Sequence, residues 1–459
     1  MISDLQKYPA LKASREPWLG DIPAHWASER AKWLFTKMDR PVREHDEVVT
    51  CFRDGVVTLR KNRRLRGFTE ATVYSGYQGI RQGDLVIHGM DAFAGAIGVS
   101  DSDGKGTPVY NVCQPRPGVN ARYYAHLLRE MSRSQWILAL AKGIRERSTD
   151  FRFEMFGNQR VPLPPPDEQA AIVRFLDWAN GRLERAIRAK RKVITLLGEQ
   201  KQAIIHRAVT RGLDPTVPLK PSGIPWLGDI PQHWEVRKLK HLTRFVNGLP
   251  FKPGDWKATG VPIIRIQNLN GSETFNYTDR TDLPEELLIQ PGDLMFAWSG
   301  NRGTSFGSFE WTRQFPGYLN QHIFKLVGYT LPKRYFYYLL RAVTRHVEEQ
   351  AGGIIGLVHV TKPELGSVYV PIAPDDEAEA LARDIDTATA EVGRTISRLE
   401  REIELLREYR TRLVADVVTG KLDVREAALL LPDEAPLDTV EDDADLPDEI
   451  EAADEEAAA

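Results

Sequence analysis

The chain has 459 residues, of which 42% are hydrophobic and 27% charged, a composition typical of globular proteins and a length that suggests two to four domains. It contains no run of about 18 apolar residues, and residues 1–11 lack an apolar core, so we expect neither a membrane span nor a signal peptide and predict a cytoplasmic protein. The two cysteines, Cys51 and Cys113, exclude a cysteine-rich zinc site and predict reduced thiols rather than a disulfide framework.

The net charge of −3 conceals an uneven distribution of charge along the chain. Residues 431–459 contain 13 acidic residues and no basic one, which leaves a charge of +10 on the rest of the chain. Residues 1–166 carry +7 and residues 215–373 carry +4. A basic body is compatible with nucleic-acid binding, and equally with an ordinary solvated surface.

The first half of the chain begins with an arm, residues 1–14, followed by a globular domain over residues 15–165. This domain opens on Pro17-Trp18-Leu19-Gly20-Asp21-Ile22-Pro23, and runs such as Asp84–Ile87 are typical of short strands. Its most basic segment, residues 60–66, holds five cations. Charge of this density suits contacts with phosphates, and it also suits a plain solvated loop.

A long helix is predicted over residues 166–213. Pro164–Pro166 precede Asp167 and Glu168, and proline followed by acid is typical of a helix start, because carboxylates favour the positive end of the helix dipole. Gly212 marks its end.

The second half repeats the first at an offset of 208 to 210 residues along most of its length. The repeat matches residues 17–23 to 225–231, Gly83-Asp84-Leu85 to 292–294, Tyr123-Tyr124 to Tyr337-Tyr338, and Pro166-Asp167-Glu168 to 374–376. We therefore predict a tandem duplication, with a second globular domain over residues 214–373 and a second helix over residues 374–423. Residues 424–459 are expected to form a disordered acidic tail, with an autoinhibitory DNA mimic as the alternative.

The two helices carry the same apolar stripe, with the 4-3 spacing of a coiled-coil seam. Its members are Leu176, Leu183, Ile187, Ile194, Leu197 and Ile204 in the first helix, and Ile385, Val392, Ile396, Leu399, Ile403, Leu406 and Leu413 in the second. The shared register predicts that the helices pair with each other, antiparallel, and the alternative is that each lies on a globular core. The predicted fold class is α+β, with two mixed domains separated by this helix pair in a pseudo-twofold duplication.

The sequence contains no constellation typical of catalysis or of metal binding. We find no phosphate-binding Gly-x-x-x-x-Gly-Lys-Ser/Thr motif and no His-Glu-x-x-His motif. His25 and His233 occupy matched positions before tryptophans, which favours a shared structural role, and Asp84 and Asp293 are expected to stabilise turns. We predict no catalytic residue, no metal site and no cofactor bound by this chain.

Candidate DNA-binding residues are Arg, Lys, Asn, Gln and Tyr side chains in basic or polar segments of the two domains. In the second domain, residues 265–270 are read as a strand with Arg265 and Gln267 on one face and Asn268 on the other. The candidates are Arg60, Lys61, Arg63, Arg64, Arg66, Tyr74, Gln78, Arg145, Arg147, Arg265, Gln267, Asn268, Asn270, Asn301, Arg302 and Gln321.

The chain resembles the specificity subunits of Type I restriction–modification systems. The resemblance is carried by the two copies of Trp-Leu-Gly-Asp-Ile-Pro, by Gly292-Asp293-Leu294-Met295-Phe296, by Tyr318–Lys325 and by the exit Val161–Gln169. It covers residues 15–425 and implies two target-recognition domains that read double-stranded DNA. The second exit, Pro371–Glu377, departs from the usual pattern because it lacks Glu-Gln, and Tyr110–Gln114 is a poor match to the Asn-Gln-His strand.

The resemblance also implies partners for the chain. It implies two modification subunits that bind the helical regions and methylate adenine with S-adenosylmethionine, and restriction subunits that use ATP and Mg²⁺ to move and cut DNA. This chain would then be a non-catalytic reader of phage and host DNA.

The expected mechanism is that each domain reads one half of a bipartite, non-palindromic sequence while the helices set the spacer. A helix of about 60 Å corresponds to at most about 18 base pairs, and inclined domains would shorten the spacer to between half a turn and one turn. Two rival functions are a self-contained DNA-modifying enzyme and a coiled-coil scaffold that binds only protein.

Overall fold

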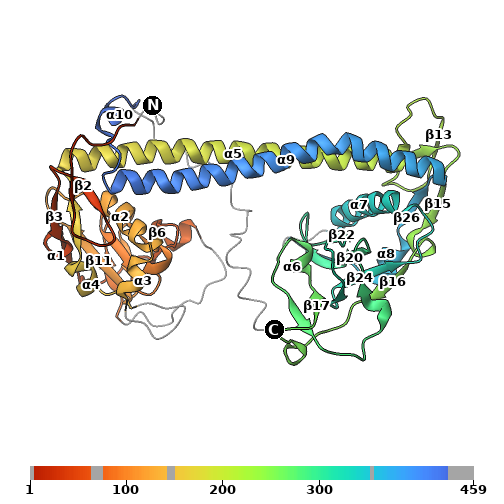
Figure 1. Ribbon diagram of the computed structural model, residues 1–459, viewed down its shortest axis with the longest axis horizontal. Coiled ribbons are helices and arrows are strands. Elements are labelled where there is room, and N and C mark those ends of the chain that lie inside the picture. The colour runs from red at the N-terminus through yellow and green to blue at the C-terminus, as the bar shows by residue number, and fades with distance from the viewer. Residues whose placement is uncertain (1–4, 64–75, 142–149, 352–355, 433–459) are drawn as a thin grey trace. The chain divides into compact units, whose positions relative to one another are not determined.

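The computed structural model describes residues 5–63, 76–141, 150–351 and 356–432 (Figure 1). The chain divides into two compact units: residues 1–189 with 402–459 form unit 1, and residues 190–401 form unit 2. The two long helices, α5 (Pro166–Arg211) and α9 (Asp375–Val418), each contribute one segment to each unit.

Unit 1 is built on an antiparallel sheet with the strand order β4-β11-β8-β9. The strands are β4 (Phe35–Lys37), β11 (Tyr110–Pro115), β8 (Leu85–His88) and β9 (Ile97–Val99). Because successive side chains in a strand point to opposite faces, Leu85 and Ile87 join the core beneath α2 (Ala121–Arg133), whereas Val86 joins a smaller core. That smaller core is closed by the paired strands β5 (Val49–Cys51) and β6 (Val57–Leu59), and β7 (Gln78–Ile80) and β10 (Gly104–Gly106).

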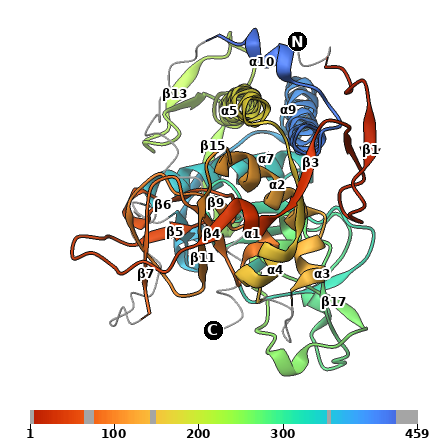
Figure 2. The same ribbon diagram turned by 90° about the vertical axis from the view of Figure 1, so that its left-hand side faces the viewer.

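Short elements complete unit 1 (Figure 2). They are the strand pairs β1 (Leu11–Ala13) with β2 (Asp21–Pro23) and β3 (Ala27–Arg30) with β12 (Arg160–Leu163), and the helices α1 (Ala31–Leu34), α3 (Trp136–Leu140), α4 (Phe153–Asn158) and α10 (Arg425–Leu429). The prediction that the tail is disordered from residue 424 onward is corrected, because Val424, Ala428 and Leu431 are buried in the core of unit 1. The remainder of the tail, residues 433–459, lies outside the described residues.

Unit 2 repeats this plan and adds a second sheet. Its first sheet has the order β16-β24-β20-β22, with β16 (Arg244–Asn247), β24 (Ile323–Val327), β20 (Leu294–Ala297) and β22 (Gly307–Glu310). Leu294 and Phe296 share a core with α7 (Lys333–Gln350), and Met295 and Ala297 share another core with the second sheet. That sheet has the order β18-β17-β23-β19, with β18 (Asn276–Thr278), β17 (Val261–Ile264), β23 (Gly317–Leu319) and β19 (Leu288–Ile289).

The remaining elements of unit 2 are short. They are the strand pairs β13 (Leu219–Pro221) with β14 (Asp229–Pro231), β15 (Glu235–Lys238) with β26 (Tyr369–Ile372) and β21 (Ser299–Asn301) with β25 (Leu357–His359), and the helices α6 (Ile266–Leu269) and α8 (Lys362–Ser367). No helix among the described residues is long and apolar enough to cross a membrane.

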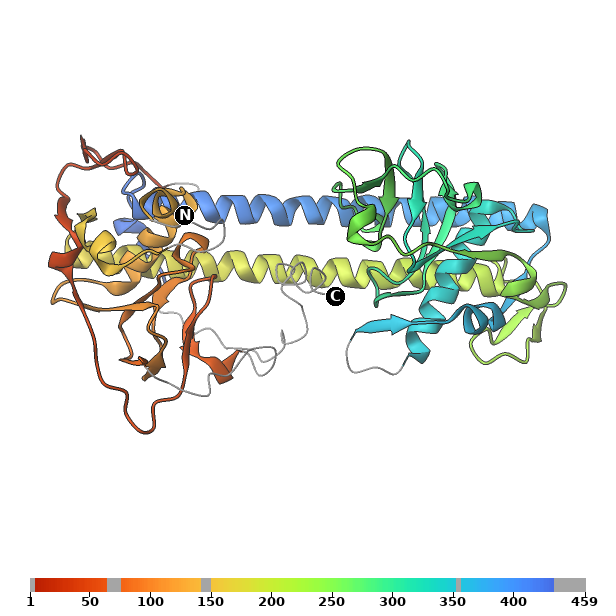
Figure 3. The ribbon, with the colours of Figure 1, turned by 90° about the horizontal axis from the view of Figure 1, so that it is seen from below.

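The predicted helix pair is confirmed within each unit, where segments of α5 and α9 lie side by side in opposite directions (Figure 3). In unit 1, Leu176 shares a core with Leu413, and Glu184 of α5 accepts a 2.9 Å hydrogen bond from Arg410 of α9. In unit 2, Ile205 shares a core with Ile385. Every predicted seam residue is buried or half-buried, and Gly212 and Gly420 follow the two helices with φ of 70° and 75°.

The structure corrects the register of the repeat at α2 and α7. Tyr123 and Tyr124 correspond to Tyr335 and Phe336, not to Tyr337 and Tyr338, because these four side chains fill matching fully buried positions. Two equivalent ion pairs support this register, namely Arg122 with Asp177 and Arg334 with Asp386. The insertion that shifts the register therefore precedes α7.

Candidate nucleic-acid interface

A carboxylate at the start of each long helix ties the helix to its globular domain, and it is buried in the first helix and half-buried in the second. Glu168 of α5 accepts hydrogen bonds from Tyr8 Oη, from Trp26 Nε1 at 2.9 Å and from His25 Nε2 at 2.8 Å. Burial and the carboxylate of Glu168 together raise the pKa of Tyr8 far above its ordinary value, so the phenol remains a proton donor. This arrangement confirms the structural role predicted for His25.

The same arrangement recurs in unit 2 around Glu377. Its carboxylate accepts hydrogen bonds from His233 Nε2 at 2.7 Å and from Trp234 Nε1 at 3.0 Å. Glu377 thus takes the place of Glu168, which is a correction of the predicted match by one residue. The unusual second exit, Pro371–Glu377, therefore keeps an acid that accepts from a histidine and a tryptophan, and moves it one position along the helix.

The matched aspartates stabilise turns, as predicted. Asp84 accepts a 2.8 Å hydrogen bond from the backbone of Arg81, and Asp293 accepts one of 2.8 Å from the backbone of Gln290. Each carboxylate also meets one cation from a neighbouring strand or loop, Arg40 in unit 1 and Lys325 in unit 2. These turns precede β8 and β20 and hold the central strands in equivalent positions.

The described residues of the basic segment of unit 1, residues 60–63, are half-buried or exposed. Arg60–Asn62 form a 3-10 turn after β6, and the exposed Lys61 and Arg63 pair with Glu47 and Asp54 at 2.5 Å each. Gln78 is 9% exposed, and its amide donates a 2.7 Å hydrogen bond to the carbonyl of Tyr110, which argues against the predicted base contact. The candidates Arg64, Arg66, Tyr74, Arg145 and Arg147 lie outside the described residues.

Residues 265–270 form the short helix α6 with flanking turns rather than the predicted strand. Asn268 is 3% exposed because its side chain closes this turn: it accepts a 2.9 Å hydrogen bond from the backbone of Arg265 and donates one of 2.8 Å to Thr274. The predicted DNA contact of Asn268 is therefore corrected. Gln267 and Asn270 are exposed, and the guanidinium of Arg265 lies 5.5 Å from the ring centre of Trp256.

The remaining candidates of unit 2 flank β21. Asn301 and Arg302 are exposed at its end, and Arg302 donates hydrogen bonds of 2.6 and 2.8 Å to the carbonyls of Glu348 and Ala351 at the end of α7. Gln321 is exposed before β24, and its carbonyl accepts a 3.0 Å hydrogen bond from Trp298 Nε1. Part of the Arg302 guanidinium thus caps a helix, whereas the exposed Gln321 side chain places its amide nitrogen 3.1 Å from His322 Nε2.

Sequence reasoning missed Trp298 and His359, which pack together with His322 in unit 2. The ring centre of Trp298 lies 5.1 Å from that of His322 and 4.9 Å from that of His359. The only feature of the sequence that pointed to this cluster was the histidine in Asn320-Gln321-His322, because His359 is 61 residues away from Trp298 in the sequence. Backbone pairing of β21 with β25 brings the two together.

Residues 231–407 match the model of the Type I restriction modification DNA specificity domain, a region that contains all of this geometry in unit 2. The chain is similar to Type I restriction enzyme specificity subunits. It is 27% identical to the EcoBI specificity subunit of Escherichia coli over 194 residues, which cover 41% of this chain and 39% of that relative. It is 22% identical to the putative MjaX specificity subunit of Methanocaldococcus jannaschii over 441 residues, which cover 89% of this chain and 96% of the relative.

The likeness extends to a solved fold. A chain from a structure concerned with complex assembly and conformational transition of the type I R-M system superimposes with a TM-score of 0.59 at 14% identity, covering 87% of this chain and 99% of that one. This likeness shows the fold alone. The chain spans 39% and 64% of the lengths of the first two curated relatives it matches.

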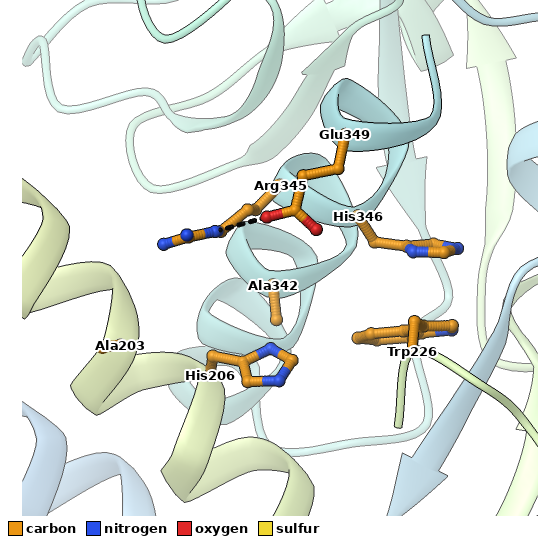
Figure 4. A pocket seen from close by; sticks show the side chains of 7 residues that line it. All are labelled: Ala203, His206, Trp226, Ala342, Arg345, His346 and Glu349. Atoms are coloured by element: carbon orange, nitrogen blue, oxygen red, sulfur yellow. Dashed lines mark hydrogen bonds and ion pairs between the residues drawn. The ribbon is translucent and has the colours of Figure 1, made fainter. Parts of the chain in front are cut away.

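A cavity of about 280 Å³ lies in unit 2, lined by residues of α5 and α7 and by Trp226 (Figure 4). Trp226 stacks on His346 of α7 at 4.7 Å between ring centres, and His206 of α5 lies 6.1 Å from the same indole. Burial and nearby Arg345 hold the pKa of His206 below its ordinary value, and burial lowers the pKa of His346. Both imidazoles are therefore neutral bases near neutral pH.

The titratable groups of the described residues do not gather into a metal site. No group of three or more His, Cys, Asp and Glu side chains able to hold a metal ion occurs in the described part of the chain. Both thiols are buried, and burial raises the pKa of Cys51 to about 12 and that of Cys113 still higher. These cysteines are protonated packing residues.

Proposed function

We propose that this chain is the DNA-reading subunit of a Type I restriction–modification complex, in which each unit reads one half of a bipartite target. The observation that carries the proposal is that the two units repeat the same internal framework but expose different polar residues. Glu168 and Asp84 of unit 1 recur as Glu377 and Asp293 of unit 2. The surfaces that this scaffold presents differ in side chains, so the two half-sites should differ and the target should not be palindromic.

The helices are proposed to set the distance between the half-sites and to bind two modification subunits. Exposed apolar side chains on the helices support the second role, because an isolated helix surface in water is ordinarily polar. Val193 and Leu196 of α5 are 44% and 54% exposed, and Leu405 and Tyr409 of α9 are 48% and 41% exposed.

Catalysis is assigned to the partners. In this proposal the modification subunits hold S-adenosylmethionine and methylate adenine, and the restriction subunits use ATP and Mg²⁺. The chain itself contributes sequence choice and binds no cofactor.

The test of the spacer role is a matched deletion in both helices of the complete complex. The Glu184–Arg410 pair fixes which levels of α5 and α9 face each other, so residues 190–196 and 398–404 form matched heptads. Removing both heptads keeps the seam register and shortens the helices by about 10 Å, which is about three base pairs. The preferred spacer should shorten accordingly while both half-sites stay the same.

The readout is the set of methylated adenines in host DNA, compared between the wild-type gene, the paired deletion and a strain that lacks the gene. An unchanged spacer would show that the helices do not measure it. Methylation or cleavage by the purified chain alone would favour a self-contained enzyme. The absence of salt-sensitive DNA binding by the assembled complex would favour a protein scaffold.

A further inference from the structure

One backbone position is equivalent in the two units and directly follows the central strand of each. In unit 1, Gly89 follows β8; its amide donates to the carbonyl of Val109 at 2.9 Å, and its carbonyl accepts from Phe151 at 3.1 Å. In unit 2, Trp298 follows β20; its amide donates to the carbonyl of His322 at 3.1 Å, and its carbonyl accepts from Val360 at 2.9 Å. The two positions therefore share one hydrogen-bonding frame.

The side chain at this position and the residues around it differ between the two units. In unit 1 it borders a cavity of about 440 Å³, whose lining includes Gly89, Asp150 and Arg152. A side chain cannot replace Gly89 without movement, because a Cβ atom would lie 2.9 Å from the carbonyl oxygen of Val109. In unit 2 the indole of Trp298 occupies the frame, and His359 stands where unit 1 has Asp150.

The Trp298 indole contacts the main chain of Gln321 and the side chain of His359 at the surface. It stacks on Phe324 at 5.8 Å between ring centres, so the indole itself is anchored to the sheet. Its Nε1 donates a 3.0 Å hydrogen bond to the backbone carbonyl of Gln321, and the edge-on ring of His359 packs against it at 4.9 Å. Gln321 and His359 are both exposed, and the Gln321 amide nitrogen lies 3.1 Å from His322 Nε2, a contact that orients the amide at the surface.

We propose that Gln321 and His359, positioned by Trp298, read purine base edges in the half-site that unit 2 recognises. A glutamine amide matches the N6 donor and N7 acceptor of adenine, and an imidazole N–H donates to N7 of either purine. Sequence reading requires such donors to be fixed in direction. Packing against Trp298 provides this for the His359 ring, and the bond from Trp298 to the Gln321 main chain, with the His322 contact of its amide, provides it for Gln321. This inference rests on the proposed function and names the side chains that carry it out in unit 2.

The experiment measures binding of the assembled complex to a library in which each target position is varied. Gln321→Ala and His359→Ala should each lose discrimination by about 5- to 100-fold at one or two base pairs of the second half-site. The first half-site should keep its full discrimination. Gln321→Glu should shift the preference at its base pair toward cytosine, because a carboxylate accepts from the cytosine amino group.

The matched control is Gln314→Ala, an exposed glutamine of the same unit whose amide bonds to the nearby carbonyl of Thr312. It should leave all positions unchanged. Equal loss of affinity for every sequence in the Gln321 and His359 variants would show phosphate contact and overturn the inference, as would unchanged discrimination. A wild-type complex that discriminates at no position would instead overturn the proposed function, so the two failures are distinguishable.

Discussion

The indole of Trp26 donates a 2.9 Å hydrogen bond to Glu168, a carboxylate whose side chain is 2% exposed at the first turn of α5. Glu168 is 142 residues away in sequence, so this bond closes the first domain onto its helix. The equivalent bond from Trp234 to Glu377 is 3.0 Å long, and the Glu377 side chain is 30% exposed.

This difference in burial predicts unequal stability losses for the two glutamates. Glu168→Ala leaves three donors without their acceptor in a buried site and should lower the free energy of unfolding by about 3 kcal/mol. Glu377→Ala, the matched control, should cost about 1 kcal/mol because water can replace the carboxylate. Urea unfolding followed by tryptophan fluorescence compares them, and equal losses would contradict the account.

The seam between the helices predicts a position-dependent effect of leucine truncation on α9. Leu413 is 4% exposed within the core of unit 1, so Leu413→Ala should destabilise the protein by about 2–5 kcal/mol through lost contacts and a cavity. Leu405 is 48% exposed on the same helix, and Leu405→Ala should change stability by less than about 0.5 kcal/mol. Thermal unfolding of both variants checks the contrast.

His126 predicts a loss of stability in mild acid. Burial, with Arg129 and Arg122 nearby, lowers the pKa of His126 to about 4 from 6.5. Because the unfolded chain takes up this proton below pH 6.5 and the folded chain does not until about pH 4, the free energy of unfolding should fall across that window, by about 2 kcal/mol.

His126→Gln removes this titration and should flatten the pH dependence of urea unfolding between pH 6.5 and 4.5. A smaller slope should remain, because the pKa values of His206 and His346 are lowered in the same direction. If the variant showed the same slope of unfolding free energy against pH as the wild type, His126 would not be the source of the pH dependence.

The exposed cations of unit 1 predict an effect on salt dependence rather than on sequence choice. Lys61→Ala and Arg63→Ala should each reduce the slope of log K against log salt concentration by about one if each contacts a phosphate. The preferred target sequence should not change, and Lys12→Ala, at an exposed residue of β1, serves as the control. Titrations of DNA with the complex at several salt concentrations measure this slope. A slope equal to that of the wild type would place both cations away from DNA.

The exposed apolar residues of α9 predict a partner surface. Leu405→Asp and Tyr409→Asp should leave thermal stability nearly unchanged, because both side chains are more than 40% exposed, yet weaken binding of the modification subunits. Trp33→Asp, at a 57% exposed residue of α1, is the control away from the helices. Sedimentation of the mixed subunits measures the binding, and retention of full assembly would exclude this surface.

Local patterns in the sequence were sufficient for the duplication, the two helices and the turn aspartates. The helices and turns depend on neighbours in the chain: a seven-residue apolar period, proline before acid, and glycine before aspartate. The duplication depends on the repetition of such short motifs at an offset of 208 to 210 residues. The prediction of a strand at residues 265–270 was wrong because alternating polar and apolar residues also suit a short turn of helix, and the side chain of Asn268 closes that turn.

The sequence by itself determined that this protein is a doubled α+β chain with two long helices, because periodicity and repetition are properties of the order of residues. Only the tertiary structure decided that Tyr8, His25 and Trp26 meet at Glu168, and that His359 meets Trp298. Such contacts join segments 61 to 160 residues apart. No local spacing encodes them, because sheet pairing and core burial select partners by position in space.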